Sequence, residues 1–146
     1  MLSVADMFFV SETNLGFDAL PAFEGYTTVA DSNVKVCSFG GIAWYVKDAL
    51  AKHLFHVCYN QAYISFRLDL APQYVFIGVY IQPEGGRYFN VNMFSDVASA
   101  LVDCRERGLI PFVGGDFKAT INHGFTMKIK TLKLTNMERH IFVTYA

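Results

Sequence analysis

Short apolar runs that end at glycine, proline or polar residues limit what this chain can fold into. They include "ADMFFVSE" (5–12), "GYTTVAD" (25–31), "SFGGIAWYVKD" (38–48), "AYISFRLDL" (62–70), "QYVFIGVYIQP" (73–83) and "LIPFVGG" (109–115). Runs of this length, rich in β-branched and aromatic residues, are typical of strands. Hydrophobic residues make up 53% of the chain, above the roughly 45–50% of an average soluble domain. We therefore expect strands that are buried on both faces.

One segment carries a helical pattern in place of a strand pattern. From about Ser95, apolar residues recur at intervals of three and four, and Gly108 stands where a helix C-cap is expected. The residues of this apolar face are Phe94, Val97, Ala98, Leu101 and Val102. A chain of 146 residues is the size of a single domain. The sequence thus predicts one strand-rich α+β domain over residues 1–146, with one clear helix.

Composition also bears on the compartment. No apolar run approaches the ~20 residues that a membrane span needs, so we expect no membrane partner. The opening "MLSVADMFFV" carries Asp6 and lacks a basic flank, unlike a secretory signal. We expect a cytoplasmic or nuclear protein that is not secreted. Cys37, Cys58 and Cys104 are widely spaced, which predicts reduced, buried thiols and not a zinc or redox pair.

Basic residues are concentrated at the end of the sequence. Residues 1–117 hold seven Lys or Arg against twelve Asp or Glu, whereas residues 118–146 hold five against one. This tail includes two predicted strands, at 125–134 and 139–145. Its basic residues suit phosphate contacts, and they equally suit the solvated face of a strand. The four besides Lys118 are Lys128, Lys130, Lys133 and Arg139.

Two acidic residues stand where buried strands give way to loops. Glu12 ends the first run, and Asp116 follows the Gly114–Gly115 pair after the last one. Rigid strands that end in loops are a common way to fix catalytic carboxylates. Oxygen ligands without a histidine or cysteine cluster favour Mg²⁺ over zinc. Isolated acids at strand ends are also common, so both interpretations stay open on the pattern alone.

The order of four segments adds a resemblance. "FFVSETNL", "GGIAWYVKDAL", "VFIGVYIQP", the helix and "IPFVGGDF" together resemble the endonuclease/exonuclease/phosphatase superfamily, which has a deoxyribonuclease I-like fold. Within this superfamily, the sequence of these segments most resembles the endonuclease domains of non-LTR (LINE-type) retrotransposons. The similar part covers residues 4–118. The resemblance implies a partial four-layer α-β-β-α sandwich.

The resemblance also implies roles for individual residues. Glu12 would bind Mg²⁺, with Mn²⁺ as a substitute, and Asp116 would orient or deprotonate the attacking water. Tyr80, just before Pro83, would contact the scissile phosphate. A metal that neutralises the phosphate and a carboxylate that aligns water together suit in-line attack on a phosphodiester.

Several positions depart from the family pattern. The family's first strand, with its asparagine, and most of the next helix have no counterpart before Met1. Lys118 replaces the asparagine of the family's G-D-F-N motif, so a side chain that only donates stands where the amide both donates and accepts. His140 lies where a terminal Ser-Asp-His motif would place its histidine, but Arg139 replaces the aspartate. We therefore expect a domain truncated at both ends, with a divergent tail at 119–146.

The resemblance implies an endonuclease-like fragment that hydrolyses DNA phosphodiester bonds with Mg²⁺, as in the nicking of retrotransposon target sites. The departures predict that this activity is weakened or lost. DNA, contacted through its phosphates, and other parts of a retrotransposon polyprotein are the expected partners. Two alternatives remain, a non-catalytic nucleic-acid-binding remnant and a phosphatase-type member of the same superfamily.

Overall fold

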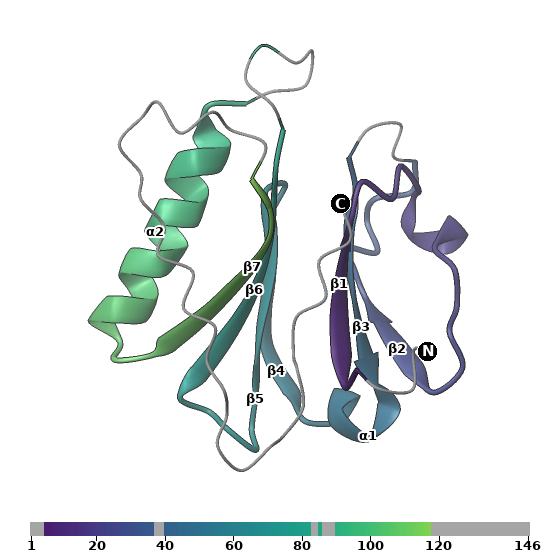
Figure 1. Ribbon diagram of the computed structural model, residues 1–146, viewed down its shortest axis with the longest axis horizontal. Helices are drawn as coiled ribbons and strands as arrows, with labels where there is room; N and C mark the ends of the chain where they lie inside the picture. Colours follow the sequence, from purple (N-terminus) through teal and green to yellow (C-terminus); the bar gives the residue numbers. More distant parts are fainter. Residues whose placement is uncertain (1–4, 37–39, 83–84, 86–89, 118–146) are drawn as a thin grey trace.

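Two β-sheets face each other, and a long helix covers the outer face of one of them (Figure 1). The computed structural model describes residues 5–36, 40–82, 85 and 90–117. The first sheet is antiparallel, in the order β1-β3-β2, and consists of β1 (Met7–Ser11), β2 (Tyr26–Val29) and β3 (Ile42–Lys47).

The second sheet has the order β4-β5-β6-β7. Its strands are β4 (Leu54–Tyr59), β5 (Tyr63–Leu68), β6 (Tyr74–Ile81) and β7 (Ile110–Phe117). The first three pair antiparallel, whereas β6 and β7 are parallel and are joined through helix α2 (Asn92–Glu106). Because parallel strands need a crossover, α2 places the ends of β6 and β7 at the same edge of the sheet.

Two shorter helical segments complete the elements, the 3-10 turn η2 (Phe17–Ala19) and α1 (Asp48–Ala51). The long helix α2 starts three residues before the predicted Ser95. At its end Gly108 adopts a left-handed φ of 66°, and the amide of Leu109 donates to the carbonyl of Cys104 at 2.8 Å. This glycine-terminated end is the one that the sequence predicts.

Aromatic side chains fill the space between the sheets. Phe9 and Trp44 of the first sheet meet Phe66, Phe76 and Phe112 of the second. The indole of Trp44 is fully buried, and its Nε1 donates to the carbonyl of Ile64 at 3.1 Å, across the interface between the sheets. Buried rings and the Trp44–Ile64 hydrogen bond therefore help to hold the sheets together.

Gly78 lies directly against side chains of the first sheet. A Cβ added there would lie 2.2 Å from Cδ2 of Phe9 and 2.7 Å from Nε1 of Trp44. No side chain fits in that space, so the glycine in "VFIGVY" is required by packing and not by backbone conformation.

The outer faces of both sheets are also covered. On the second sheet, α2 packs Met93, Val97 and Cys104 against Val75, Ile77 and Val79. On the first sheet, Phe8 and Tyr45 pack with residues from the connection between β1 and β2, namely Phe17, Leu20 and Phe23. Both sheets are thus buried on two sides, as the high apolar fraction predicts, and the α+β class is confirmed.

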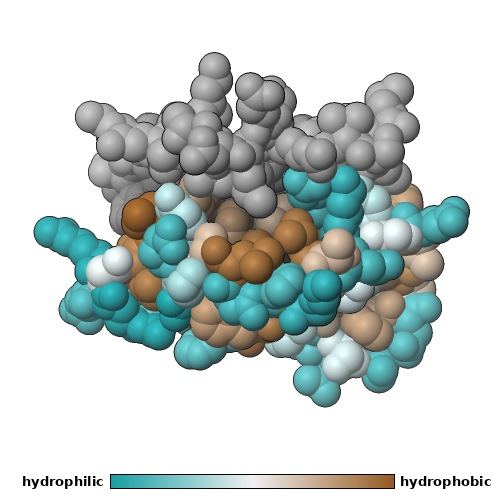
Figure 2. Space-filling model, turned by 90° about the horizontal axis from the view of Figure 1, so that it is seen from below, coloured by the Kyte–Doolittle hydropathy of each residue, from teal (hydrophilic) through white to brown (hydrophobic). Residues whose placement is uncertain are grey.

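The lower end of the sandwich in Figure 1 carries apolar surface. Figure 2 views the molecule from below and shows apolar residues along the middle of this end, with hydrophilic residues around them. Leu70, in the turn before β6, and Ile110, at the start of β7, are 58% and 42% exposed. None of the described helices is long and apolar enough to cross a membrane.

Two predictions need correction. Strand β4 is absent from the runs identified in the sequence, because His56 takes a left-handed φ of 51° and the pairing register shifts between Phe55 and Cys58. Cys58 is exposed, so the expectation of buried thiols is wrong there, whereas Cys104 is buried. The tail strands predicted at 125–134 and 139–145 lie outside the described residues.

Candidate functional site

Tyr80 and Asp116 are neighbours at one end of the second sheet. The parallel register of β6 and β7 pairs them directly. Phe76 and Phe112 belong to the core between the sheets, and side chains on a strand alternate between faces. An even spacing therefore places Tyr80 and Asp116 on the same face, directed toward the first sheet.

Glu12 reaches this pair from the opposite sheet. It follows β1 immediately, and the hydroxyl of Tyr80 donates a hydrogen bond to its Oε1 at 2.9 Å. The body of Tyr80 is 5% exposed, whereas Glu12 is exposed. A buried phenol therefore fixes a carboxylate that remains open to solvent. The structure thus brings together the three residues that the resemblance implies.

The backbone at Glu12 explains how its side chain turns inward. Phe8 and Val10 face the outer side of the first sheet, so a continued strand would direct position 12 outward as well. Instead Glu12 adopts a φ of 56° and Asn14 a φ of 51°. Left-handed backbone at residues other than glycine costs about 1–3 kcal/mol and often occurs at functional sites.

A glycine pair supports this left-handed turn. The amide of Thr13 donates to the carbonyl of Gly41 at 3.2 Å, and that of Asn14 donates to Gly40 at 2.7 Å. Gly40 itself has a φ of 70°, and a Cβ there would lie 3.0 Å from Cε1 of Tyr80. The "GG" before β3 therefore bonds to the two residues that follow Glu12, and Gly40 lies against the ring of Tyr80.

A second glycine pair precedes Asp116. Gly115 has a φ of 138°, and a Cβ there would lie 1.8 Å from the carbonyl oxygen of Val79. Only glycine allows β7 to approach β6 this closely at that point. The glycines of "FVGGDF" thus set the position of the carboxylate that follows them.

The donor chemistry of this end fits a magnesium ion. Mg²⁺ is usually bound through one or two carboxylates and completes its shell with water and substrate phosphates. Glu12 and Asp116 supply carboxylates at the same end of the sandwich. Within the described part of the chain, no three His, Cys, Asp or Glu side chains form a group that could hold a metal ion.

A cavity of about 680 Å³ lies beside the Glu12–Tyr80 pair. Tyr80 and Gln82 line it from the end of β6, and Tyr59, Asn60 and Gln61 line it from the turn between β4 and β5. Further walls come from the loops before and after β2. Apart from Tyr80, sequence reasoning missed these residues, because they come from strand ends and loops that converge only in the folded chain.

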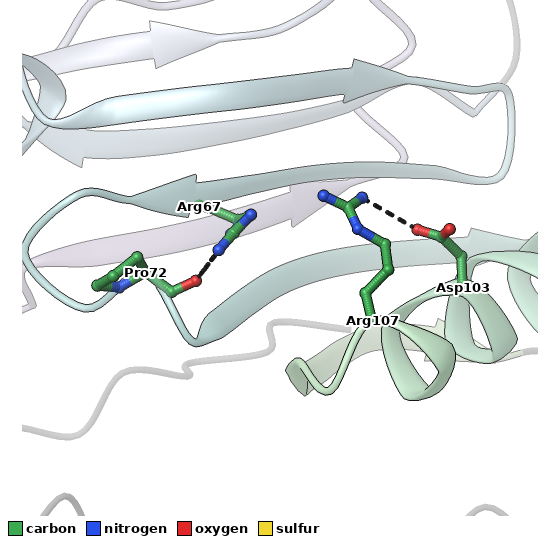
Figure 3. A network of polar contacts seen from close by, with 4 residues as sticks. All are labelled: Arg67, Pro72, Asp103 and Arg107. Atoms are coloured by element: carbon green, nitrogen blue, oxygen red, sulfur yellow. Dashed lines mark hydrogen bonds and ion pairs between the residues drawn. The ribbon is translucent and has the colours of Figure 1, made fainter.

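A smaller groove of about 350 Å³ lies between α2 and the outer face of the second sheet. Figure 3 shows its two arginines, each held by a protein group. Nε of Arg67 donates to the carbonyl of Pro72 at 2.8 Å, and Arg107 pairs with Asp103 at 3.3 Å. The Arg67 guanidinium also lies over the ring of Phe55 at 4.9 Å. These contacts fasten the turn before β6 and the end of α2.

Near the two cavities, burial shifts the pKa of one thiol and one phenol. Burial raises the pKa of the Cys104 thiol, and the neighbouring Asp103 carboxylate raises it further. Burial also raises the pKa of Tyr59, with a smaller contribution from Asp31 across the larger cavity. The neutral form of each group is therefore favoured further.

Lys118 and His140, the other two candidate residues, lie outside the described residues. The site that the structure describes therefore consists of Glu12, Tyr80 and Asp116. A scan against protein-family models and searches of curated proteins and of solved structures find no match for this chain.

Proposed function

We propose that this chain is an endonuclease-like domain with a partial deoxyribonuclease I-like sandwich, which hydrolyses DNA phosphodiester bonds with Mg²⁺. The specific reaction would be the nicking of target DNA for a non-LTR retrotransposon. The observation that carries the proposal is the Glu12–Tyr80 hydrogen bond of 2.9 Å, with Asp116 paired beside Tyr80. Three residues from distant parts of the chain thus lie at one end of the sandwich, which supports the proposal.

Glu12 would hold the Mg²⁺ ion through its exposed carboxylate. When bound, such an ion neutralises charge on a phosphate and orients it for in-line attack. The left-handed backbone at Glu12 supports this role, because it directs the side chain toward the second sheet.

Asp116 would accept a proton from the attacking water or orient it. It is partly exposed, and the glycines before it fix its backbone. A carboxylate that is held in place can align water within hydrogen-bond reach of a phosphorus atom. The hydroxyl of Tyr80 holds Glu12 in this arrangement and lies at the same edge, where a phosphate oxygen would bind.

The activity should be weak. Lys118 replaces an amide that the family uses in its G-D-F-N motif, and Arg139 replaces the aspartate before His140. Residues that act as one catalytic unit fail together and not additively. We therefore expect a low rate of nicking, and not the rate of an intact enzyme of this family.

Nicking of supercoiled plasmid in Mg²⁺ tests the proposal. We expect slow conversion to open circles that stops with a chelator and is lost in Glu12→Ala and in Asp116→Ala. Glu106→Ala is the matched control, since it removes an exposed carboxylate from the far end of α2. Wild-type protein without nicking, or nicking that survives Glu12→Ala, would contradict the proposal.

A non-catalytic nucleic-acid-binding protein is the second candidate. The observation that favours it is the excess of basic residues at 118–146. Affinity for duplex DNA would then fall with salt, with a log–log slope near −0.9 per phosphate neutralised. Binding that shows this slope, without nicking, would favour this candidate. Hydrolysis of inositol phosphates or phospholipids, and not of DNA, would favour a phosphatase of the same superfamily.

A further inference from the structure

Apolar residues form most of the wall of the cavity of about 680 Å³ beside Tyr80. Half of the large hydrophobic residues that the described part of the chain exposes line this cavity. Exposed apolar residues that gather in one place usually mark a binding surface, whereas single ones need no explanation. The volume also lies within the roughly 300–1,000 Å³ of small-molecule sites. The four exposed residues are Leu15 (38%), Val34 (39%), Val36 (84%) and Tyr59 (47%).

The charge of the cavity restricts the ligands that it can take. Among the described residues that line it, Asp31 is the one charged side chain. Lys35, the nearest basic residue along the chain, pairs with Asp18 at 3.4 Å and is not part of the wall. An anion such as a phosphate would therefore meet a carboxylate and no cation among these residues. A cationic ligand is the one with a complementary charge.

The carboxylate of Asp31 is held in place by its own turn. Its Oδ1 accepts from the backbone amide of Asn33 at 2.9 Å and from Nδ2 of the same residue at 3.0 Å. Within the described residues its Oδ2 accepts no hydrogen bond. One oxygen of a fixed carboxylate is thus left for a donor from a ligand. An ammonium group is a suitable donor, because hydrogen bonds between charged partners are roughly twice as strong as neutral ones.

Tyr59 adds an aromatic ring near this carboxylate. Burial is the main cause that raises the pKa of Tyr59, and the charge of Asp31 raises it further. A charge has such an effect on another group only when the two lie close together. A cation that binds to Asp31 would therefore lie near the ring of Tyr59, and the face of an aromatic ring attracts cations.

We propose that this cavity binds an organic ammonium ion with an apolar, aromatic body. The ammonium group donates to Asp31 and lies near the ring of Tyr59, while the body of the ligand packs against the apolar walls. The ring of Tyr80 also lines the cavity and its hydroxyl bonds to Glu12, so the bound amine lies next to the candidate site. This inference does not rest on the proposed function, because binding of an amine requires no DNA and no nicking.

Three indole compounds that differ mainly in charge test the inference. At neutral pH tryptamine is a cation, tryptophol is neutral and indole-3-propionate is an anion. Each compound is titrated into the full chain in an isothermal titration calorimeter. We expect tryptamine to bind once per chain and tryptophol to bind about tenfold more weakly, because it lacks the charged donor. Indole-3-propionate should show no binding.

Three variants locate the bound amine. Asp31→Asn removes the charge but keeps the oxygen that accepts from Asn33, so it should weaken tryptamine binding about tenfold and leave tryptophol binding unchanged. Tyr59→Leu removes the ring but keeps an apolar side chain, and it should weaken tryptamine binding about threefold. Glu106→Gln is the control, since it removes one negative charge at the far end of α2 and should match wild type. Melting curves from circular dichroism confirm that each variant is folded.

Several outcomes would overturn the inference. Equal affinities of wild type for tryptamine and tryptophol would mean that the cavity selects apolar bulk and not charge. Tryptamine binding that survives Asp31→Asn, or no tryptamine binding at millimolar concentrations, would also show that the inference is wrong. A dimer in light scattering that Val36→Ser dissociates would assign the cavity to a second copy of the chain instead. Wild-type protein that binds tryptamine as expected but does not nick DNA would contradict the proposed function alone.

Discussion

Gly78→Ala should strongly destabilise the sandwich, because the space between Gly78 and the first sheet has no room for a methyl group. The added methyl would lie 2.2 Å and 2.4 Å from two ring carbons of Phe9 and 2.7 Å from Nε1 of Trp44. Carbon atoms pack best at about 3.5–4.0 Å, so the sheets or the ring must move by more than about 1 Å. Overpacking of a core typically costs about 1–3 kcal/mol, and contacts this short predict the upper end of that range.

Urea denaturation followed by tryptophan fluorescence measures this change directly. Trp44 is the one tryptophan of the chain, and it lies at the point of contact, so its emission reports both unfolding and local packing. A loss of about 3 kcal/mol would be about a fifth to three-fifths of the free energy of unfolding of a typical domain, which is about 5–15 kcal/mol. We also expect the emission of folded Gly78→Ala to differ from that of wild type.

Two comparisons separate the steric cause from others. Gly108→Ala places a methyl in open space but at a φ of 66°, so it should cost only about 1 kcal/mol through its backbone. Phe9→Ala removes the ring that the methyl would meet, so the double variant should be less destabilised than the sum of the single variants. A Gly78→Ala protein within about 0.5 kcal/mol of wild type would refute the reasoning, since surface substitutions already reach that range.

Four further predictions concern the site and the thiols. Tyr80→Phe should lower plasmid nicking about tenfold, the loss expected when one well-placed hydrogen bond is removed, and circular dichroism should show a fold unchanged from wild type. Gly115→Ala should lower both nicking and the urea midpoint, because its methyl would lie 1.8 Å from the carbonyl of Val79; a variant with normal nicking would contradict the role given to the glycine. Iodoacetamide should modify Cys58 before Cys104 in a mass-spectrometric time course, because Cys58 is exposed and burial raises the pKa of Cys104. Since the unfolded chain loses the Cys104 proton first as pH rises, stability should fall through the usual thiol range, and Cys104→Ala should reduce this fall.

The sequence alone was sufficient to predict the strands and the helix that have a local residue pattern. The apolar runs before Glu12 and Asp116 form strands β1 and β7, and the three-and-four spacing after Asn92 forms α2. The alternation of apolar and polar residues did not reveal β4, because His56 interrupts this strand with a left-handed backbone conformation. A pattern method cannot recognise a strand whose side chains do not alternate.

The sequence pattern singles out Glu12 and Asp116, but only the resemblance joins Tyr80 to them. Glu12 and Tyr80 are 68 positions apart, and no local rule relates them. The parallel register that pairs Tyr80 with Asp116 depends on how α2 returns the chain to the sheet. The cavity beside them was not predicted, because Tyr59, Gln61 and Gln82 lie at or just beyond strand ends whose approach depends on the whole fold.

Because the site is divided between two sheets, it is sensitive to any displacement of one sheet relative to the other. Glu12 extends from the first sheet, while Tyr80 and Asp116 belong to the second. Sliding of one sheet over the other would lengthen the contact between Glu12 and Tyr80 before it broke any pairing within a sheet. Catalysis would then fail at a denaturant concentration at which each sheet is still intact. The rate of nicking would therefore report how well the two sheets are aligned.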